Sequence, residues 1–296
     1  MYKQIISKTA LHKNDATYTP YSYDLNVYRG CEHKCTYCYA MYSHKFLEDD
    51  NFFNNIYFKA NIDTVLDEQL SSGKFNNEII GVGTVCDSYQ PIEKQMNLTS
   101  KCLDVFIKHK TSIYLSTKSP LVLKDIEKLK TLSELTPISI DMTIISPNPQ
   151  LVELLEPNTV DTTTRFETLK QLKQNTSALV GIHLMPIIPY ITDSPEDLEE
   201  IYKTAKQLEL DFVVTDVLNL YGETRKSFFN FVKHNLPDKY DQIRKLYASS
   251  KALAEYRKNI RALCREIRIK HDFKNKYIRD FIENNRPKQL SLIWYF

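Results

Sequence analysis

Up to about Gly222, short and almost continuously apolar segments alternate with longer segments whose apolar positions recur at helical spacing. The apolar segments are rich in Val and Ile, which is typical of strands that are covered on both faces. We expect six strands, at Tyr23–Tyr28, Glu78–Thr84, Ser112–Thr117, Pro137–Ile144, Ala178–Ile188 and Asp211–Val217. Strands buried on both faces occur mainly in parallel sheets, so the pattern predicts a parallel sheet at the centre of the protein.

The segments between these strands favour helices. We expect helices at Asp63–Leu70, Lys94–Lys108, Leu121–Leu132, Thr163–Gln174 and Pro195–Leu208. The last of these has the clearest start, because Ser194 is a good N-cap residue, Pro195 suits the first helical position, and two acids follow. Strand–helix alternation builds βαβ units. The predicted fold class is therefore α/β, a partial (β/α)6 TIM-like barrel with a C-terminal helical extension.

The strand pattern stops after Gly222, and residues 223–285 have the pattern of several polar helices. The chain closes with the apolar segment Leu292–Phe296, which we expect to dock back on the body. This organisation predicts an N-terminal segment at 1–20, a barrel core at 21–222, and a helical, basic extension at 223–296. In such folds the chemistry lies at the carboxyl ends of the strands.

Composition excludes several classes of protein. The chain has 296 residues, of which 42% are hydrophobic and 26% charged, as in an ordinary globular protein. No segment approaches the roughly 20 apolar residues of a membrane span. The N-terminal segment MYKQIISKTALHKND lacks the apolar core of a signal peptide. We therefore expect a cytoplasmic protein that makes no membrane contact.

Positive charge is concentrated near the C-terminus. Between Lys251 and Lys288 stand twelve Lys or Arg residues and five acids, a net charge of +7, although the whole chain carries only +2. Two interpretations stay open. The basic segment is either a surface for a polyanion such as DNA or RNA, or an ordinary solvated helix face.

The six cysteines are unevenly spread. Three of them stand between Cys31 and Cys38, whereas Cys86, Cys102 and Cys264 lie far apart in the sequence. Disulfides are rare in cytoplasmic proteins, so this distribution indicates a metal site together with isolated thiols. With only six glycines, the chain has no Gly-rich phosphate loop.

Cys31, Cys35 and Cys38 follow the first predicted strand and therefore occupy a loop at the mouth of the barrel. Thiolates are soft ligands that suit iron–sulfur clusters, and one short loop with these spacings can bind three corners of an iron–sulfur cube. Three ligands for four irons leave one iron open for a small molecule. The alternative is a zinc site in which His33 or His44 completes a tetrahedron, although a second Cys pair of the usual zinc spacing is lacking.

The segment Tyr28–Ala40 resembles the cluster loop of the radical S-adenosylmethionine (SAM) superfamily, whose signature is C-x3-C-x2-C with an aromatic residue before the last Cys. Tyr37 occupies that aromatic position. The resemblance implies two cofactors, a [4Fe–4S] cluster and SAM, with a reductant such as flavodoxin or ferredoxin as a partner. It also implies that SAM chelates the open iron and is cleaved to a 5′-deoxyadenosyl radical, which abstracts hydrogen from a substrate.

Further motifs resemble the spore photoproduct lyase-like group of this superfamily. They are Asp24–His33, Gly83–Glu93 with its Tyr-Gln-Pro-Ile-Glu run, Thr117-Lys118-Ser119, Ile138-Ser139-Ile140, Leu155-Glu156-Pro157 with Arg165 downstream, and Met185–Pro189. The resemblance covers roughly residues 5–245. It implies that Asp87, Lys118, Ser139 and Arg165 are neighbours of SAM, and that Tyr37 and Tyr39 either take part in radical transfer or pack against the cluster and the adenine. An ammonium suits the methionyl carboxylate, and a hydroxyl suits the ribose or amino group.

Cys86 departs from the pattern of that group. The lyase uses a cysteine in this loop to return a hydrogen atom to its product, and that position aligns with Thr84, two residues before Cys86. In a continued strand, positions two apart share a face, so Cys86 stays a candidate hydrogen donor. The alternative is a buried structural thiol. Because of this departure, the resemblance does not extend to spore photoproduct repair.

Three classes of function follow. The leading hypothesis is a radical SAM enzyme that acts on an unidentified substrate, with nucleic acid as one candidate. The second is a nucleic-acid-binding protein whose cysteine loop holds structural zinc. The third is a protein that keeps an iron–sulfur cluster for structure or electron transfer.

Overall fold

The computed structural model describes residues 1–16, 19–47, 49 and 51–278. Its centre is a seven-stranded sheet in the order β10-β9-β8-β7-β6-β3-β2. The strands are β2 (Leu11–Lys13), β3 (Tyr23–Leu25), β6 (Ile79–Val82), β7 (Ser112–Thr117), β8 (Ser139–Thr143), β9 (Leu179–Ile187) and β10 (Phe212–Val217). The six strands from β3 to β10 pair in parallel, and β2 pairs antiparallel with β3. The predicted parallel α/β sheet is confirmed.

A second, smaller sheet is formed by strands from the N-terminal part of the chain. It has the order β1-β5-β4, formed by Tyr2–Ile5, Ile56–Lys59 and Tyr28–Arg29. The pattern of apolar residues did not predict β1 or β5, which carry mixed and partly exposed residues. This sheet flanks the cysteine loop, because β4 ends at Arg29 and the loop begins immediately after it.

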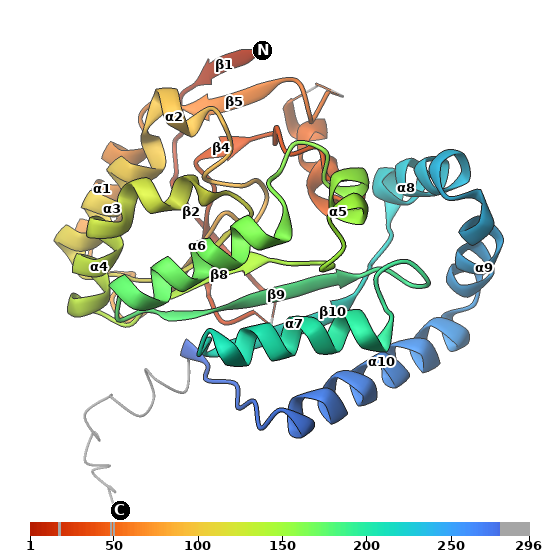
Figure 1. Cartoon of the computed structure of the whole chain (residues 1–296). Coiled ribbons are helices and arrows are strands. Elements are labelled where there is room, and N and C mark those ends of the chain that lie inside the picture. Colours follow the sequence, from red (N-terminus) through yellow and green to blue (C-terminus); the bar gives the residue numbers. More distant parts are fainter. Residues whose placement is uncertain (17–18, 48, 50, 279–296) are drawn as a thin grey trace, which may run out of the picture.

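Helices connect the parallel strands and cover the sheet (Figure 1). They are α1 (Ile62–Ser71), α2 (Glu93–Met96), α3 (Leu98–His109), α4 (Ile126–Leu135), α5 (Pro149–Leu155), α6 (Thr162–Asn175) and α7 (Pro195–Gln207), with 3-10 helices η1 (Tyr39–Leu47) and η2 (Pro120–Asp125). After β10 come α8 (Gly222–Asn235), α9 (Pro237–Ala248) and α10 (Ser250–Lys270). Helix α10 packs along α7 and β10, so the C-terminal helices lie against the sheet.

The core lies between the sheet and its helices. Ile140 and Met142 of β8, Leu115 of β7 and Ile182 of β9 are fully buried there. Alternate residues of the same strands are polar, among them Ser116, Asp141 and His183. Because successive side chains of a strand point to opposite faces, one face of the sheet packs against helices and the other carries chemistry-bearing groups.

Two predicted elements are shorter than expected. The strand predicted at Tyr23–Tyr28 ends at Leu25, because the side chain of Asn26 bonds Thr84 Oγ1 at 2.9 Å and the Val85 amide at 2.8 Å in place of ladder pairing. The helix predicted at Lys94–Lys108 is divided into α2 and α3 by Asn97, whose φ of 53° is left-handed.

The strand predicted at Ser112–Thr117 has the bounds of β7, and the helix predicted at Leu121–Leu132 is divided between the 3-10 helix η2 and α4. The remaining expected strands and helices of the core are present with shifted ends. The helical expectation for residues 223–285 is met by α8, α9 and α10 over the described range, and the predicted docking of Leu292–Phe296 lies outside the described residues. The division into three domains stays a prediction. Among the described residues, no helix is long and apolar enough to cross a membrane.

Candidate functional site

The cysteine loop begins at a glycine that no other residue can replace without strain. Gly30 has a φ of +81°, and a Cβ at this position would lie 2.6 Å from the Asn55 carbonyl oxygen. The next residue fixes the start of the turn, because the Cys31 amide donates to the Phe52 carbonyl at 3.2 Å. At the end of the loop the Cys38 amide donates to the Cys35 carbonyl at 3.1 Å. These contacts hold the three cysteines in one compact turn.

The three thiols of this loop are shielded from solvent. Cys31 and Cys35 are 8% and 7% exposed, Cys38 is half-buried, and all three are free of disulfides. Burial raises the pKa of each thiol. Asp87 and the other two thiols raise the pKa of Cys31 further, and Glu156 and Cys38 raise that of Cys35. A bound metal would therefore have to displace protons from these sulfurs. Among the described residues, no three His, Cys, Asp or Glu side chains converge closely enough to hold one metal ion.

Buried polar atoms without a hydrogen bond occur in the cysteine loop and in the segment after β6. Thr36 Oγ1 and Ser88 Oγ form none, and His33 Nδ1 has an ion-pair contact with Asp87 but no hydrogen bond. Buried polar groups are nearly always paired, so these atoms mark a place where a ligand belongs. The donor set also fits, because three soft thiolates on one short loop are the ligands of an iron–sulfur cluster. The residues of the loop therefore fit an iron–sulfur cluster with a small molecule beside it.

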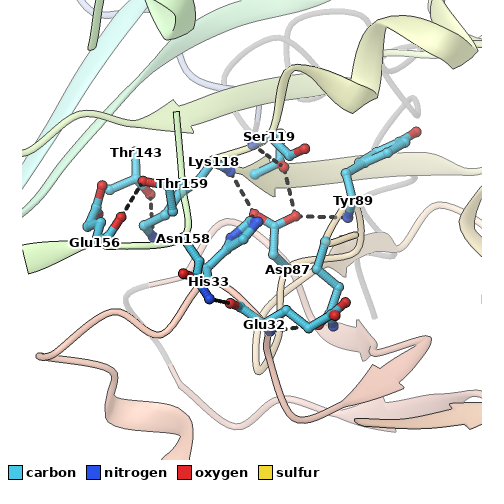
Figure 2. Close-up of polar contacts among 12 residues, drawn as sticks. Glu32, His33, Asp87, Tyr89, Lys118, Ser119, Thr143, Glu156, Asn158 and Thr159 are labelled. Atoms are coloured by element: carbon cyan, nitrogen blue, oxygen red, sulfur yellow. Dashed lines mark hydrogen bonds and ion pairs between the residues drawn. The ribbon is translucent and has the colours of Figure 1, made fainter. Parts of the chain in front are cut away.

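Asp87 ties the end of β6 to the end of β7. Its Oδ1 accepts from the Tyr89 amide at 2.8 Å and from Thr117 Oγ1 at 2.7 Å, and its Oδ2 accepts from the Lys118 amide at 2.7 Å. His33 Nδ1 lies 3.3 Å from the same Oδ2. Figure 2 shows Asp87 between His33 of the cysteine loop and Lys118 of the strand end. The Asp87 carboxylate thus connects the cysteine loop, where the cluster is predicted, with the end of β7, where the SAM site is predicted.

Lys118 stands at the carboxyl end of β7 and turns toward the cysteine loop. Its Nζ donates to Thr143 Oγ1 at 3.3 Å and lies 5.9 Å from the centre of the Tyr37 ring. Burial disfavours its charge, but Cys35 and Glu156 outweigh that effect, so the pKa of Lys118 is raised and the side chain stays an ammonium at neutral pH. A hydroxyl is its only direct partner in the described part of the chain, so the ammonium can still bind an anion.

Tyr37 is held from behind by a buried ion pair. Its hydroxyl donates to Glu156, whose other oxygen accepts from Arg165 Nη2 at 2.5 Å. Burial opposes ionisation of Glu156, but Arg165 and Lys118 outweigh it and lower the pKa of the carboxyl. Arg165 also donates to the backbone carbonyls of Thr143 and Val160, at 2.8 and 2.9 Å. The guanidinium is fully buried, so the structure places Arg165 behind the site, where it positions the Glu156 loop.

Two other loops brace the cysteine loop. The Thr36 amide donates to Leu155 O at 2.9 Å, and Asn158 donates to the carbonyls of His33 and Glu32, from its amide at 3.3 Å and its side chain at 2.8 Å. On the opposite side, Gln90 accepts from the Glu32 amide at 2.9 Å and donates to the Gly30 carbonyl at 3.0 Å. Backbone groups of the cysteine loop are therefore satisfied by residues far away in the sequence (Figure 2).

Tyr39 and Cys86 lie at the edge of this arrangement. Tyr39 is 59% exposed, and its hydroxyl donates to the Thr84 carbonyl. Cys86 is buried, and its Sγ donates to the Tyr28 carbonyl at 3.1 Å. The Cys86 thiol thus points toward β4. Neither contact tests the predicted roles of these residues, which stay predictions.

Ser139 is not brought together with Lys118. It is the first residue of β8 and pairs in register with Tyr114 of β7, whereas Lys118 reaches Thr143 at the last residue of β8. The sequence did not single out Thr143 and Asn158, and it placed Glu156 in a motif without a role for its side chain. Thr143 had a signal, since it lies four residues after Ser139 on the same strand face.

Comparison with known proteins identifies related chains. A protein of Mycobacterium tuberculosis described as uncharacterised is 26% identical over 252 residues, which cover 83% of this chain and 73% of that protein. One of Methanocaldococcus jannaschii, also described as uncharacterised, is 29% identical over 221 residues, covering 75% of this chain and 79% of that protein.

Solved structures share the fold. A spore photoproduct lyase variant with bound AdoMet and dinucleoside spore photoproduct aligns with a TM-score of 0.60 and 14% identity, covering 78% of this chain and 66% of that chain, just under two thirds of its length. The radical SAM methyltransferase TsrM of Kitasatospora setae, with cobalamin and a [4Fe–4S] cluster bound, aligns with a TM-score of 0.50 and 12% identity, over 71% of this chain and 36% of that chain. At such identities the likeness shows the fold alone.

The family model described as Radical SAM superfamily matches residues 25–205. This range includes the three cysteines, Asp87, Lys118, Glu156 and Arg165, and it is well over half of the chain. The chain therefore belongs to the radical SAM superfamily, whose members use a [4Fe–4S] cluster and S-adenosylmethionine.

Proposed function

We propose that this protein is a radical SAM enzyme that abstracts hydrogen from an unidentified substrate. The observation that carries the proposal is the meeting of three free thiols with the Lys118 ammonium and with unpartnered polar atoms at the carboxyl edge of a parallel sheet. When bound and reduced, the cluster supplies the electron that cleaves SAM to a 5′-deoxyadenosyl radical. The remaining task of the protein is to bind, orient and shield. We also propose that the six parallel strands form the partial barrel expected from the sequence.

Cys31, Cys35 and Cys38 are proposed to hold the cluster. Their burial keeps water from the sulfurs, and the braces from Gln90 and Asn158 fix the loop before any metal is bound. A pre-formed loop loses less conformational freedom when the cluster binds. Tyr37 supports the same loop, because its ring lies beside Lys118 and its hydroxyl is fixed by Glu156.

Lys118 is proposed to bind the methionyl carboxylate of SAM. An ammonium paired with a carboxylate makes a charge-assisted hydrogen bond, and Thr143 already orients the Nζ toward the loop. Asp87 supports this role by fixing the backbone of Lys118. Its carboxylate oxygens accept hydrogen bonds from the Lys118 amide and from the Thr117 hydroxyl. Arg165 is proposed to act through Glu156 and Tyr37. For Ser139 the predicted contact with SAM stays a proposal, with Thr143 as the nearer hydroxyl.

Tyr39 and Cys86 are proposed as candidates for the hydrogen-transfer step. Tyr39 is exposed beside the cysteine loop and is bonded to the carbonyl of Thr84, the position that aligns with the hydrogen-donor cysteine of the lyase. For Cys86 the contact of its thiol with the Tyr28 carbonyl favours the structural alternative. Substitution of Tyr39 or of Cys86 distinguishes a role in hydrogen transfer from a purely structural role.

A nucleic acid is proposed as a partner of the C-terminal helices. Helix α10 carries seven basic residues and two acids, and a spore photoproduct lyase structure with a bound dinucleoside shares the fold. Arg261 Nη2 lies 3.8 Å from Asp216 Oδ1, and Arg257 donates to Asn219, so the basic helix borders the carboxyl end of β10. A polyanion bound there would reach the cluster side of the sheet. The other proposed partner is a reductant such as flavodoxin or ferredoxin.

Anaerobic reconstitution tests the proposed function. The protein is loaded with iron and sulfide, reduced with dithionite, mixed with SAM and assayed for 5′-deoxyadenosine. We expect four irons per chain and formation of 5′-deoxyadenosine. Zinc without iron or sulfide in protein purified anaerobically would favour the zinc-site alternative. A loaded cluster that never yields 5′-deoxyadenosine, even with a broad substrate panel, would favour a structural or electron-transfer cluster.

A further inference from the structure

A second polar cluster lies on the same face of the sheet, further from the cysteine loop. It is formed by Tyr114 and Ser116 of β7, Asp141 of β8 and His183 of β9. In register, Tyr114 lies opposite Ser139 and Ser116 opposite Asp141. Because Lys118 and Thr143 continue the same alternation toward the strand ends, the cluster lies directly below the proposed SAM site.

These side chains form a continuous chain of contacts. Ser116 Oγ donates to Asp141, at 2.8 Å from one carboxylate oxygen and 2.9 Å from the other. His183 Nδ1 lies 3.2 Å from Asp141 Oδ1, and His183 Nε2 lies 2.8 Å from the Tyr114 hydroxyl. Asp141 therefore orients the imidazole, and the imidazole orients the phenol. Each member has its position set by another member.

Burying this polar cluster costs free energy, and other protein groups do not satisfy all of its hydrogen-bonding capacity. Asp141 is fully buried, and within the described residues it forms no ion pair with Lys or Arg. Burial raises the pKa of its carboxyl, which reflects the cost of the charge there. Ser139 lies on the same face two residues earlier, is 1% exposed, and its Oγ has no hydrogen-bond partner. A buried hydroxyl without a partner, on the same strand face as a buried carboxylate that lacks a Lys or Arg counterion, is unusual for groups that serve stability alone.

Aromatic rings close the end of the sheet face that is distant from the cysteine loop. The ring of Tyr114 packs against Tyr21 with 5.8 Å between centroids and against Phe212 with 6.4 Å. Phe212 lies flat on β9 only because residue 181 is a glycine, since a Cβ there would be 2.5 Å from the ring. His183 and Ser116 keep partial exposure. The cluster is thus not sealed from solvent, and Lys118 follows the other end of β7.

We propose that this cluster is the polar end of the substrate site and that it binds a neutral or cationic group with N–H or O–H donors. The inference rests on the proposed function, which requires a substrate below SAM. A carboxylate has about four acceptor sites, and Ser116 and His183 use only part of those on Asp141. The negative charge of Asp141 disfavours an anionic group. The Ser139 hydroxyl can form a further hydrogen bond with a bound group that is neutral or cationic.

Probe titrations of the holoenzyme test the inference without SAM or a reductant, so they can fail while the cluster and 5′-deoxyadenosine formation stay intact. Histidines are labelled with ¹³C at Cε1, and the oxidised-cluster protein is titrated with acetamide, with acetate, which has the same size and shape, and with the smaller methylammonium. The His183 signal is assigned by its loss in His183→Gln. His271, which bonds Glu199 on the surface, is the internal reference. A four-atom probe is expected to bind no tighter than about 10⁻⁵ M.

We expect acetamide or methylammonium, but not acetate, to move the His183 signal in a saturable way. Ser139→Ala should weaken the binding about fivefold, the value of one hydrogen bond, while leaving the free energy of unfolding unchanged or higher because its hydroxyl has no partner. The control is Ser112→Ala on the neighbouring strand β7, whose hydroxyl bonds Thr136. The proposal is overturned if no probe moves the signal, if acetate moves it equally, or if Ser139→Ala binds like the wild type.

Discussion

Arg165 Nη2 lies 2.5 Å from Glu156 Oε2, and both side chains are buried behind Tyr37. The pair connects α6 with the loop that follows α5, and through Tyr37 with the cysteine loop. An ion pair of this kind is expensive to desolvate, and its usual benefit is a defined geometry. Here that geometry is the orientation of the aromatic residue before the last cysteine.

Removing one partner of this pair should destabilise the protein strongly. We expect Glu156→Gln to lower the free energy of unfolding by about 3–5 kcal/mol, because Arg165 is left charged and buried without its counterion. Denaturant titration measures this. The double variant Glu156→Gln/Arg165→Met should recover part of the loss. As a control, Lys170→Ala breaks an exposed pair with Glu167 and should cost less than about 1 kcal/mol. Equal losses in Glu156→Gln and Lys170→Ala would contradict the structural role.

Each cysteine of the loop should be needed for the cluster. Cys31→Ala, Cys35→Ala and Cys38→Ala are expected to abolish reconstitution, since each thiolate binds one iron. Iron and sulfide analysis with the visible spectrum is the measurement. Cys102→Ala, a change at a buried thiol outside the loop, is the matched control and should keep the full iron content. A loop variant with full iron content would remove that cysteine from the ligand set.

Lys118 should be needed for SAM and not for the cluster. We expect Lys118→Ala to weaken SAM binding at least about tenfold, because a charge-assisted contact contributes roughly 1.5–3 kcal/mol. Equilibrium dialysis of SAM with the oxidised protein measures the affinity, and iron analysis checks the cluster. Lys130→Ala on the exposed side of α4 is the control. An unchanged affinity would exclude Lys118 from the site.

Gly30→Ala should damage the cysteine loop through its backbone. The new Cβ meets the Asn55 carbonyl at 2.6 Å and the φ of +81° disfavours alanine, so we expect poor cluster loading. Gly222→Ala separates strain from collision, because φ is also positive (+50°) there but no atom lies within 4 Å of the new Cβ. Iron content after reconstitution is compared. Equal loading of the two variants would show that the collision at Gly30 is unimportant.

Lys59 should make stability rise at alkaline pH. It is 3% exposed, and burial, with a smaller effect of Arg29, lowers its pKa to about 8. Between pH 8 and the pKa of an unfolded lysine, the unfolded chain binds more protons, so the free energy of unfolding increases with pH by up to about 3 kcal/mol. Below pH 8 this gain is absent.

Lys59→Met should remove that component of the pH dependence and be more stable than the wild type at pH 7. Denaturant titrations at pH 7 and pH 10 measure both effects. Lys110→Met, at an exposed lysine, is the control and should keep the slope of the wild type. A variant Lys59→Met with the slope of the wild type would disprove the assignment.

The parallel sheet was predictable because its signal is local. β7 and β10 are runs of apolar and β-branched residues close to their predicted ranges, and Ser194 with Pro195 starts α7 as expected. Asp87 and Lys118 were predicted from resemblance of their motifs to a known group, and Lys118 also directly follows β7, whereas Asp87 lies in the segment after β6. These features depend on a few neighbouring residues.

The rest of the site depends on contacts between distant segments. Nothing near Thr36 indicates that its amide bonds Leu155, and nothing near Glu156 indicates a fully buried carboxylate. Ser139 was assigned by resemblance of its motif to the spore photoproduct lyase-like group, and its contact with SAM stays a prediction. The register of β8 places Ser139 at the start of the strand and Thr143 at its end. Strand register is a property of the folded sheet, so the depth of each side chain in the sheet could not be predicted from the sequence.

The braces of the cysteine loop have a consequence for biosynthesis. The proposed ligands stand at residues 31–38, but Gln90, Leu155 and Asn158, which hold their backbone, are made much later. A ribosome adds about 5–20 residues per second, so the cysteines wait several seconds before their supports exist. Cluster insertion is therefore expected to follow translation of the sheet through α6, and a nascent chain halted before Asn158 should be a poor acceptor for the iron–sulfur assembly machinery.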